Sequence, residues 1–232
     1  MNNTLYMVVP AAGVGARMAA SCPKQYLPLG EKSIIEHTLA RLLAFGRTEA
    51  VVVALGEFDE YWPDTEFANH PMVKTVIGGS ERVHSVFNAL QYLLAQGAAP
   101  DSWVMVHDAA RPCISQTDLE NLWAKRDPQG ALLGSQVRDT MKRTDANGVV
   151  LHTVPRELLW HALTPQMAPL KVLHDAISHC LAQGMLITDD ASALEGIGLQ
   201  PRMVAGNPGN IKITRPQDLA LAELYLQQEN TQ

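Results

Sequence analysis

Cysteine is scarce in this sequence of 232 residues: Cys22, Cys113 and Cys180 are the only three, and no two of them form a CxxC pair. An odd number of widely spaced cysteines argues against a disulfide framework and a zinc site, and it suits a reducing compartment. The chain also lacks a leading basic-then-apolar signal, and it contains no apolar run of membrane length. We therefore expect a cytoplasmic protein with no membrane partner.

Positive charge is in deficit as well. Lys and Arg number 18 against 24 Asp and Glu, which gives a formal net charge of -6, so we expect no nucleic-acid partner. Hydrophobic residues make up 47% of the chain, which is ordinary for a globular protein with a core. The length is large for a minimal domain and small for two, so we expect one domain over residues 1–232.

Short apolar, β-branched runs alternate with helical patterns along the chain. This alternation predicts an α/β fold with a Rossmann-like, mostly parallel sheet covered by helices on both faces. The expected strands are residues 5–9, 50–55, 74–77, 103–107, 131–135, 201–204 and 211–213. The expected helices are residues 33–44, 82–94, 117–125, 170–182 and 216–227.

One segment breaks this alternation. Asp145-Ala146-Asn147-Gly148 joins two polar flanks, and Asn-Gly is the strongest short signal for a β-hairpin. A two-stranded ribbon with so little apolar content is marginal in water by itself. We therefore expect a β-hairpin arm, about residues 136–156, that projects from the domain and pairs with the same arm of a second subunit. The alternative is a surface hairpin that packs on its own domain.

Small residues follow the first expected strand in Pro10-Ala11-Ala12-Gly13-Val14-Gly15-Ala16-Arg17-Met18. They let the backbone approach a ligand, and exposed N–H groups there suit phosphate oxygens. The segment is neither a Walker loop, because no Gly-Lys-Ser/Thr closes it, nor a good dinucleotide fingerprint, because Met18 stands at the third glycine position. Arg17 and the nearby Lys24 can neutralise a triphosphate. A plain tight turn with two solvated cations is the alternative.

A carboxylate follows the apolar run 103–107. Asp108 would lie at the carboxyl end of this strand, where open α/β sheets bind their ligands. The two alanines after it leave space for Mg²⁺, which prefers one or two protein carboxylates together with phosphates and water. A helix-capping role is the alternative, but Pro112 delays the next helix. His107 suits a buried, supporting position better than a ligand position, because no metal-binding spacing includes it.

Two further segments place polar groups at expected strand ends. Gly78-Gly79-Ser80-Glu81-Arg82-Val83-His84-Ser85 opens a helix after the third expected strand. Lys212 lies between two isoleucines on the expected strand 211–213, which would bury it. A buried lysine is costly unless it is paired, so a bound anion would be a suitable partner.

Taken in order, these motifs resemble those of the 2-C-methyl-D-erythritol 4-phosphate cytidylyltransferases of the non-mevalonate isoprenoid pathway. The resemblance covers nearly the whole chain. It runs through residues 10–18, 23–25, 107–112, 137–142, 159–166, 188–192 and 210–214. It implies transfer of CMP from CTP to methylerythritol phosphate, a small phosphorylated polyol, with release of pyrophosphate. It also implies Mg²⁺ or another hard divalent cation as cofactor and a homodimer formed through the arm.

The resemblance further implies a role for each site residue, with Asp108 as the metal ligand. The implied catalytic residues are Arg17, Lys24, Arg156 and Lys212. The implied CTP-binding residues are Pro10, Ala11, Ala12, Gly13, Gly15, Arg17, Lys24, Gly79, Ser80, Arg82, Ser85, Asp108, Ala109 and Lys212. The implied acceptor-binding residues are Asp108, Arg111, Thr140, Arg156, Thr164, Thr188 and Lys212. Of these, Thr140 and Arg156 would reach the site of the neighbouring subunit.

Three residues, Ser80, Asn88 and Pro155, depart from the pattern of the family, and none of them is an implied catalytic residue. The nearest alternative function is that of a ribitol-5-phosphate cytidylyltransferase with the same fold. A nucleotide-sugar glycosyltransferase would normally show Asp-x-Asp, and a nucleotide-binding regulatory protein would bind CTP without releasing pyrophosphate. Some relatives carry a fused cyclodiphosphate synthase domain, whereas here we expect a single activity.

Overall fold

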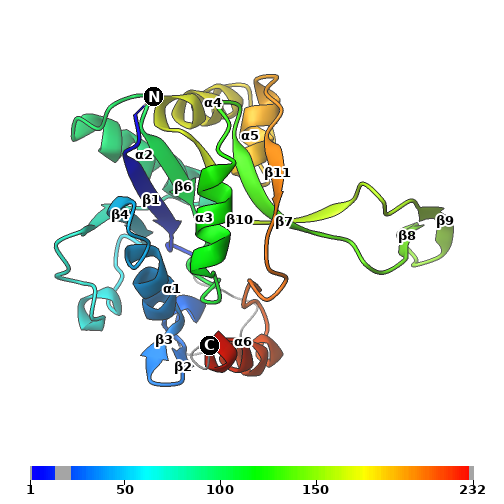
Figure 1. Ribbon diagram of the computed structural model, residues 1–232, viewed down its shortest axis with the longest axis horizontal. Coiled ribbons are helices and arrows are strands. Elements are labelled where there is room, and N and C mark those ends of the chain that lie inside the picture. The colour runs from blue at the N-terminus through cyan, green and yellow to red at the C-terminus, as the bar shows by residue number, and fades with distance from the viewer. Residues whose placement is uncertain (1, 14–21, 230–232) are drawn as a thin grey trace.

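A seven-stranded sheet forms the centre of the computed structural model, which describes residues 2–13 and 22–229 (Figure 1). The strands lie in the order β11 (Arg202–Ala205), β7 (Ala131–Gln136), β10 (Trp160–Pro169), β6 (Trp103–Val106), β1 (Leu5–Pro10), β4 (Thr48–Leu55) and β5 (Val73–Ile77). Neighbours run parallel except at β10, which is antiparallel to both β6 and β7. The predicted α/β class with a mostly parallel sheet is confirmed.

Helices cover both faces of the sheet. They are α1 (Ile34–Leu43), α2 (Arg82–Ala95), α3 (Gln116–Ala124), α4 (Leu170–Ala182), α5 (Asp190–Gly196) and α6 (Gln217–Glu229), with 3-10 turns η2 (Lys24–Tyr26) and η3 (Trp62–Asp64) and a hairpin of β2 (Pro28–Leu29) and β3 (Lys32–Ser33). Successive side chains of a strand face opposite sides. Met7 thus joins the core with α1 and α3, and Val8 joins the core with α2 and α4. Among the described helices, none is long and apolar enough to cross a membrane.

The elements that the sequence pattern does not predict include β10 and α5. Strand β10 contains Pro165 and Pro169, and its pairing with β7 shifts register midway, so its residues show no regular alternation. Helix α5 has 7 residues and begins with a capping box, in which the Asp189 side chain accepts a hydrogen bond from the Ser192 N–H at 2.9 Å. Both elements contribute residues to the carboxyl edge of the sheet.

The strand predicted at residues 211–213 is wrong. This described segment is irregular chain that follows two turns, closed by bonds from the Asn210 N–H to the Asn207 carbonyl and from the Ile211 N–H to the Gly209 carbonyl. The N–H of Ile213 donates to the carbonyl of Ala110 at 2.9 Å, so the segment crosses just beyond the end of β6. Lys212 is therefore half-buried at an edge of the sheet, not buried within it.

The predicted hairpin arm is present and projects far from the body of the molecule (Figure 1). Strands β8 (Met141–Thr144) and β9 (Val150–Val154) form a separate two-stranded sheet, and Gly148 in the turn has a φ of 82°. Every side chain of β8 is exposed. The alternative of a hairpin packed on its own domain is wrong, while pairing with a second subunit stays a prediction.

Candidate active site

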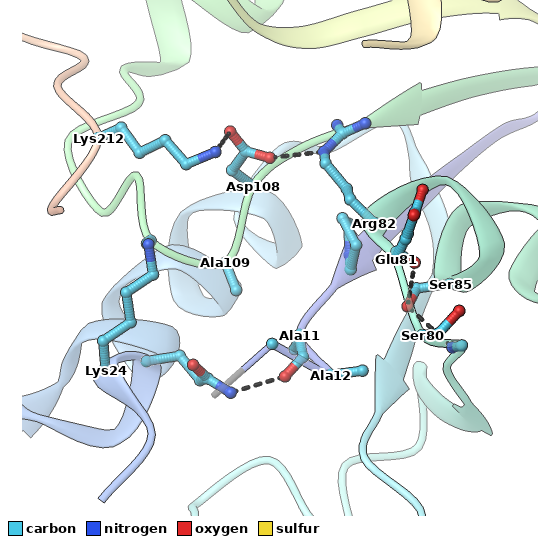
Figure 2. A pocket seen from close by; sticks show the side chains of 15 residues that line it. Ala11, Ala12, Lys24, Ser80, Glu81, Arg82, Ser85, Asp108, Ala109 and Lys212 are labelled. Atoms are coloured by element: carbon cyan, nitrogen blue, oxygen red, sulfur yellow. Dashed lines mark hydrogen bonds and ion pairs between the residues drawn. The ribbon is translucent and has the colours of Figure 1, made fainter. Parts of the chain in front are cut away.

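The carboxyl ends of β1, β5 and β6 meet at one edge of the sheet, and the segments that follow them enclose a cavity of about 190 Å³ (Figure 2). The lining residues are Pro10, Ala11, Ala12, Gly13, Lys24, Gln25, Gly79, Ser80, Glu81, Arg82, Ser85, Asp108, Ala109, Ala110 and Lys212. Every predicted CTP-binding residue that the structure describes is in this set. Gly15 and Arg17 lie outside the described residues. Gln25, Glu81 and Ala110 also line the cavity, although they are not among the binding residues expected from the sequence.

Small residues allow the segments after β1 and β5 to come close together. A Cβ atom on Gly78 would lie 2.5 Å from the Ala12 Cβ and 2.7 Å from the Ser85 Oγ. The Ser85 Oγ accepts a hydrogen bond from the Gly79 N–H at 3.1 Å, which ties the start of α2 to the turn before it. Backbone and short side chains therefore form the wall of the cavity on this side, which leaves space for a flat ring beside it.

Asp108 is buried at the end of β6 and is surrounded by cations. Its Oδ1 lies 2.9 Å from the Arg82 Nε, and its Oδ2 lies 2.9 Å from the Lys212 Nζ and 3.3 Å from the Arg111 Nε (Figure 2 shows the first two). Burial alone would raise the pKa of this carboxyl, but the charges of Arg82, Lys212 and Arg111 hold the pKa well below its usual range. Asp108 is therefore a fixed negative charge near neutral pH.

The backbone at Asp108 is fixed by a buried histidine, as expected for His107. The His107 Nε2 lies 3.0 Å from the Arg111 carbonyl oxygen, which can only accept, so Nε2 carries the proton. The Nδ1 then accepts from the Thr164 hydroxyl at 2.9 Å, and the Thr164 Oγ1 accepts from the Asp108 N–H at 3.2 Å. Burial lowers the pKa of His107 to about 4, so the ring is neutral. This chain of bonds joins β6 to β10.

Arg82 connects Asp108 to a second buried carboxylate. Its two terminal nitrogens lie 3.1 Å and 2.8 Å from the oxygens of Asp190, a bidentate pair, while its Nε contacts Asp108. Asp190 is the first residue of α5 and is 3% exposed. Asp190 lies in the family motif at residues 188–192, but no site role is expected of it from the sequence, because nothing in its local pattern reveals a partner that lies 108 residues away.

Lys24 and Lys212 come from distant parts of the chain and lie on the same side of the cavity, away from Ser80 and Ser85 (Figure 2). Lys24 belongs to η2, and its Nζ donates to the carbonyl of Ile213 at 3.1 Å. Lys212 follows β11 and pairs with Asp108. Two ammonium groups that face one cavity provide the positive charge that a triphosphate requires.

A second cavity adjoins the first. Its lining residues are Arg82, Asp108, Arg111, Ala162, Leu163, Thr164, Gln166, Thr188, Asp189 and Lys212. Arg82, Asp108 and Lys212 line both cavities, so the two meet at this charged cluster. The predicted acceptor residues of the body all lie here. Thr140 and Arg156 lie elsewhere, on the arm, where the Arg156 guanidinium donates to the carbonyl of Arg138.

The first cavity fits a cation held mainly by a substrate. Among the described residues there is no group of three or more His, Cys, Asp or Glu that could hold a metal ion without other ligands. Asp108 and Glu81 are the acidic residues of the described lining, and Asp108 stands at the junction of the cavities. One carboxylate with phosphate oxygens and water is an ordinary set of ligands for Mg²⁺.

Two of the residues that depart from the family pattern have local structural partners. The Ser80 Oγ lies 3.2 Å from the His84 Nδ1, one turn further along α2. The Asn88 side chain donates to the carbonyl of Ile77 at the end of β5 at 3.0 Å. Both contacts tie α2 to the segment before it, and they leave the charged cluster unchanged.

The fold and the paired cavities define a class of protein. A Rossmann-like sheet that gathers a small-residue turn, two lysines and a fixed carboxylate at its carboxyl edge is the arrangement of a nucleotidyltransferase. The model of the 2-C-methyl-D-erythritol 4-phosphate cytidylyltransferase (IspD) family matches residues 5–228, and the chain belongs to this family.

Curated relatives and solved structures agree with this assignment. A 2-C-methyl-D-erythritol 4-phosphate cytidylyltransferase of Aeromonas hydrophila is 52% identical over 227 residues, which cover 97% of this chain and 91% of that protein. One of Vibrio vulnificus is 52% identical over 228 residues, with coverage of 97% and 96%. The crystal structure of the Francisella tularensis enzyme is 33% identical, with a TM-score of 0.83 and coverage of 96% and 99%.

Membership of this family defines the reaction. The chain is a cytidylyltransferase of isoprenoid synthesis, and it converts CTP and 2-C-methyl-D-erythritol 4-phosphate into the CDP-linked alcohol. The alternatives of a glycosyltransferase and of a binding protein without activity do not match these findings.

Proposed function

We propose that the transfer takes place where the two cavities meet, with CTP in the cavity lined by residues 10–13 and the methylerythritol phosphate in the cavity lined by Thr164 and Thr188. The observation that carries this proposal is the cluster of Arg82, Asp108 and Lys212, which lines both cavities. An α-phosphate beside this cluster and an acceptor phosphate from the other side would be within reach of one another.

The reaction depends more on the positioning of the two substrates than on proton transfer. A phosphate oxygen of the acceptor attacks the α-phosphorus of CTP in line, the bond from that phosphorus to the β-phosphate oxygen breaks, and pyrophosphate leaves. The nucleophile is already an anion, so no strong general base is required. What remains is to bring two anions together and to stabilise the crowded phosphorus, which are tasks for fixed cations.

The lysines have separate tasks in this proposal. Lys24 lies in the first cavity only, so it neutralises the triphosphate and the leaving pyrophosphate. Lys212 lies in both cavities, so it can contact the acceptor phosphate and the α-phosphate together. Arg17, which is outside the described residues, would add to the charge on the triphosphate.

Mg²⁺ would be held by Asp108 together with phosphate oxygens, and when bound it would neutralise charge on the triphosphate. Asp108 already contacts Arg82, Arg111 and Lys212. One of these contacts would therefore lengthen as the metal binds, and Lys212 is the suitable one, because it is the most exposed of the three cations.

Recognition of cytosine would come from the narrow side of the first cavity. Ala12, the Gly78–Gly79 turn and Ser85 lie in close contact there. Backbone groups and the Ser85 hydroxyl would pair with the edge of the base. A wrong base would leave these polar groups unpaired, which is an effective way to reject it.

The arm would complete the acceptor cavity of a second subunit. Val149, Val150 and Leu151 near its tip are 60%, 55% and 61% exposed, although they are apolar. A homodimer would bury them and would carry Thr140 and Arg156 to the acceptor cavity of the partner. One domain per chain and a cytoplasmic location, which suits the three free cysteines, complete the proposal.

Pyrophosphate release tests which acceptor the second cavity takes. The purified protein would be incubated with CTP and Mg²⁺, with methylerythritol phosphate and ribitol 5-phosphate as separate acceptors. Release with the first acceptor alone is the expected result. Release with ribitol 5-phosphate alone would contradict the proposed acceptor cavity while keeping the chemistry at the α-phosphate.

A further inference from the structure

Lys24 stands on a short turn and belongs to no strand or long helix of the described chain. It begins the short turn η2, which is closed by bonds from the Tyr26 N–H to the Pro23 carbonyl at 2.9 Å and from the Leu27 N–H to the Lys24 carbonyl at 3.1 Å. A single 3-10 turn is a weak support for a catalytic side chain. The bond from the Lys24 Nζ to the Ile213 carbonyl holds the end of the side chain, so the turn itself still needs support.

The two side chains that follow Lys24 fasten this turn to two other segments of the chain. The Gln25 side chain is 3% exposed, and its Nε2 donates to the Ala11 carbonyl at 2.6 Å. The Tyr26 hydroxyl donates to the Asp59 Oδ2 at 2.7 Å, and its ring stacks on Tyr61 with centroids 5.4 Å apart. The first contact reaches the segment after β1, and the second reaches the segment after β4.

Asp59 is itself rigidly held. Its Oδ1 accepts hydrogen bonds from the N–H groups of Tyr61 and Trp62, both at 3.1 Å, at the start of η3. Trp62 is buried in the same core cluster as residues of α1. A hydrogen bond from a phenol to a carboxylate is about twice as strong as one between neutral groups. Burial and the bond to Asp59 both raise the pKa of Tyr26, so the phenol keeps its proton.

We propose that Tyr26 and Asp59 are positioning residues that hold the Lys24 ammonium group at the triphosphate. The inference rests on the proposed role of Lys24. Neither residue lines the cavity. Their effect on turnover therefore has to pass through the turn that carries Lys24, and it should vanish when the Lys24 side chain is absent.

The main test combines two substitutions. Tyr26→Phe keeps the ring stacked on Tyr61 but removes the hydrogen bond, and it should lower kcat about tenfold, since a misplaced catalytic group is expensive. The KM for CTP should stay within about twofold, because the loss is felt in the transition state. In a Lys24→Ala background, Tyr26→Phe should leave the residual kcat unchanged, because the two residues act as one unit.

A matched control separates positioning from general loosening. Thr48 is buried at the other end of β4, and its hydroxyl donates to the Leu42 carbonyl at 2.8 Å. Thr48→Val removes a buried hydroxyl hydrogen bond, here to a neutral carbonyl, far from the cavity. It should leave kcat unchanged. Asp59→Asn, which weakens the contact from the other side, should lower kcat like Tyr26→Phe, and the double variant should be no worse than either single one.

The outcomes distinguish the anchor from the role of Lys24. A normal kcat for Lys24→Ala would overturn both proposals. A low kcat for Lys24→Ala with a normal kcat for Tyr26→Phe and Asp59→Asn would overturn the anchor alone. An equal loss from Tyr26→Phe with and without Lys24, or an equal loss from Thr48→Val, would also overturn it.

Discussion

The charged cluster at the sheet edge and the projecting arm differ in how far one subunit pairs or buries their side chains. At the sheet edge Asp108 is 6% exposed and contacts three cations, and the neighbouring His107 and Thr164 complete each other's hydrogen bonds. On the arm, apolar side chains such as Val150 and Leu151 are more than half exposed. The first region is complete in one subunit, whereas the second has surface that folding of one subunit leaves uncovered.

This difference divides the proposed active site in two. The groups expected to bind the nucleotide come from segments of one body, which the sheet brings together. Two groups expected to bind the acceptor, Thr140 and Arg156, stand on the arm and outside the cavity of their own body. CTP binding should therefore need one subunit, and transfer should need two.

The largest effect is expected inside the first region. Lys24→Ala removes a cation from the triphosphate, and turnover should fall by about 10²–10³-fold, the usual cost of one lost stabilising group. The melting temperature should be unchanged. Steady-state pyrophosphate release measures the effect, and Lys171→Ala, which removes an exposed lysine paired with Asp175 on α4, serves as the control. Near-normal turnover for Lys24→Ala would show that its charge is not used.

The second-largest effect is expected from a substitution on the arm. Leu151→Asp places a charge on the exposed apolar part of the arm, so it should oppose dimerisation and lower turnover by about 10²-fold, since the acceptor groups are no longer positioned. CTP binding measured by calorimetry should persist. Analytical ultracentrifugation reports the oligomeric state, and Leu224→Asp on α6 is the control for an equally simple exposed substitution. A monomeric Leu151→Asp protein with full turnover would contradict the division.

A moderate effect on stability is expected at the junction. Thr164→Val leaves the Asp108 N–H and the His107 Nδ1 without their partner in a buried place. Unpaired buried groups of this kind cost about 1–3 kcal/mol. Chemical denaturation should show this loss in the free energy of unfolding, together with a raised KM for the acceptor. An unchanged unfolding midpoint would mean that the network does not hold the two strands.

The smallest effects are expected from two glycine substitutions, one beside the first cavity and one on the arm. Gly78→Ala would push against Ala12 and Ser85, so the KM for CTP should rise about tenfold. Gly148→Ala strains only a positive-φ turn at the tip of the arm, with open space around it, at about 1–2 kcal/mol of local cost. Its KM for CTP should be normal. Equal effects on the KM of CTP would remove the contrast between the regions.

The sequence predicts best what depends on neighbouring residues. The apolar runs of β1, β4 and β6, the turn at Gly148 and the position of Asp108 at a strand end all follow from local pattern. The partners of Arg82 and Tyr26 do not, because Asp190 and Asp59 are brought to them only by the packing of distant segments. No local sequence pattern predicts such contacts.

The wrong prediction at Lys212 has the same origin. An apolar pair of isoleucines around a lysine is typical of a buried strand, yet the turns at residues 207–211 redirect the chain across the end of β6. The expected partner is a bound anion, whereas in the structure Lys212 pairs with the carboxylate of Asp108 in the same chain. The need of Lys212 for a negative partner follows from the sequence, whereas the path of the backbone depends on the contact with Ala110.

The most direct test of the shared site mixes two variants of low activity, Lys24→Ala and Arg156→Ala. The mixture is left until the variants have exchanged subunits and formed hybrid dimers. If Lys24 and Arg156 of one site come from different subunits, a hybrid dimer contains one intact site, and an equal mixture should regain about one quarter of the wild-type turnover. If both residues served the same site from one subunit, every site of the hybrid would remain defective. A mixture with no regained turnover, in which hybrid dimers have been detected, would contradict the account.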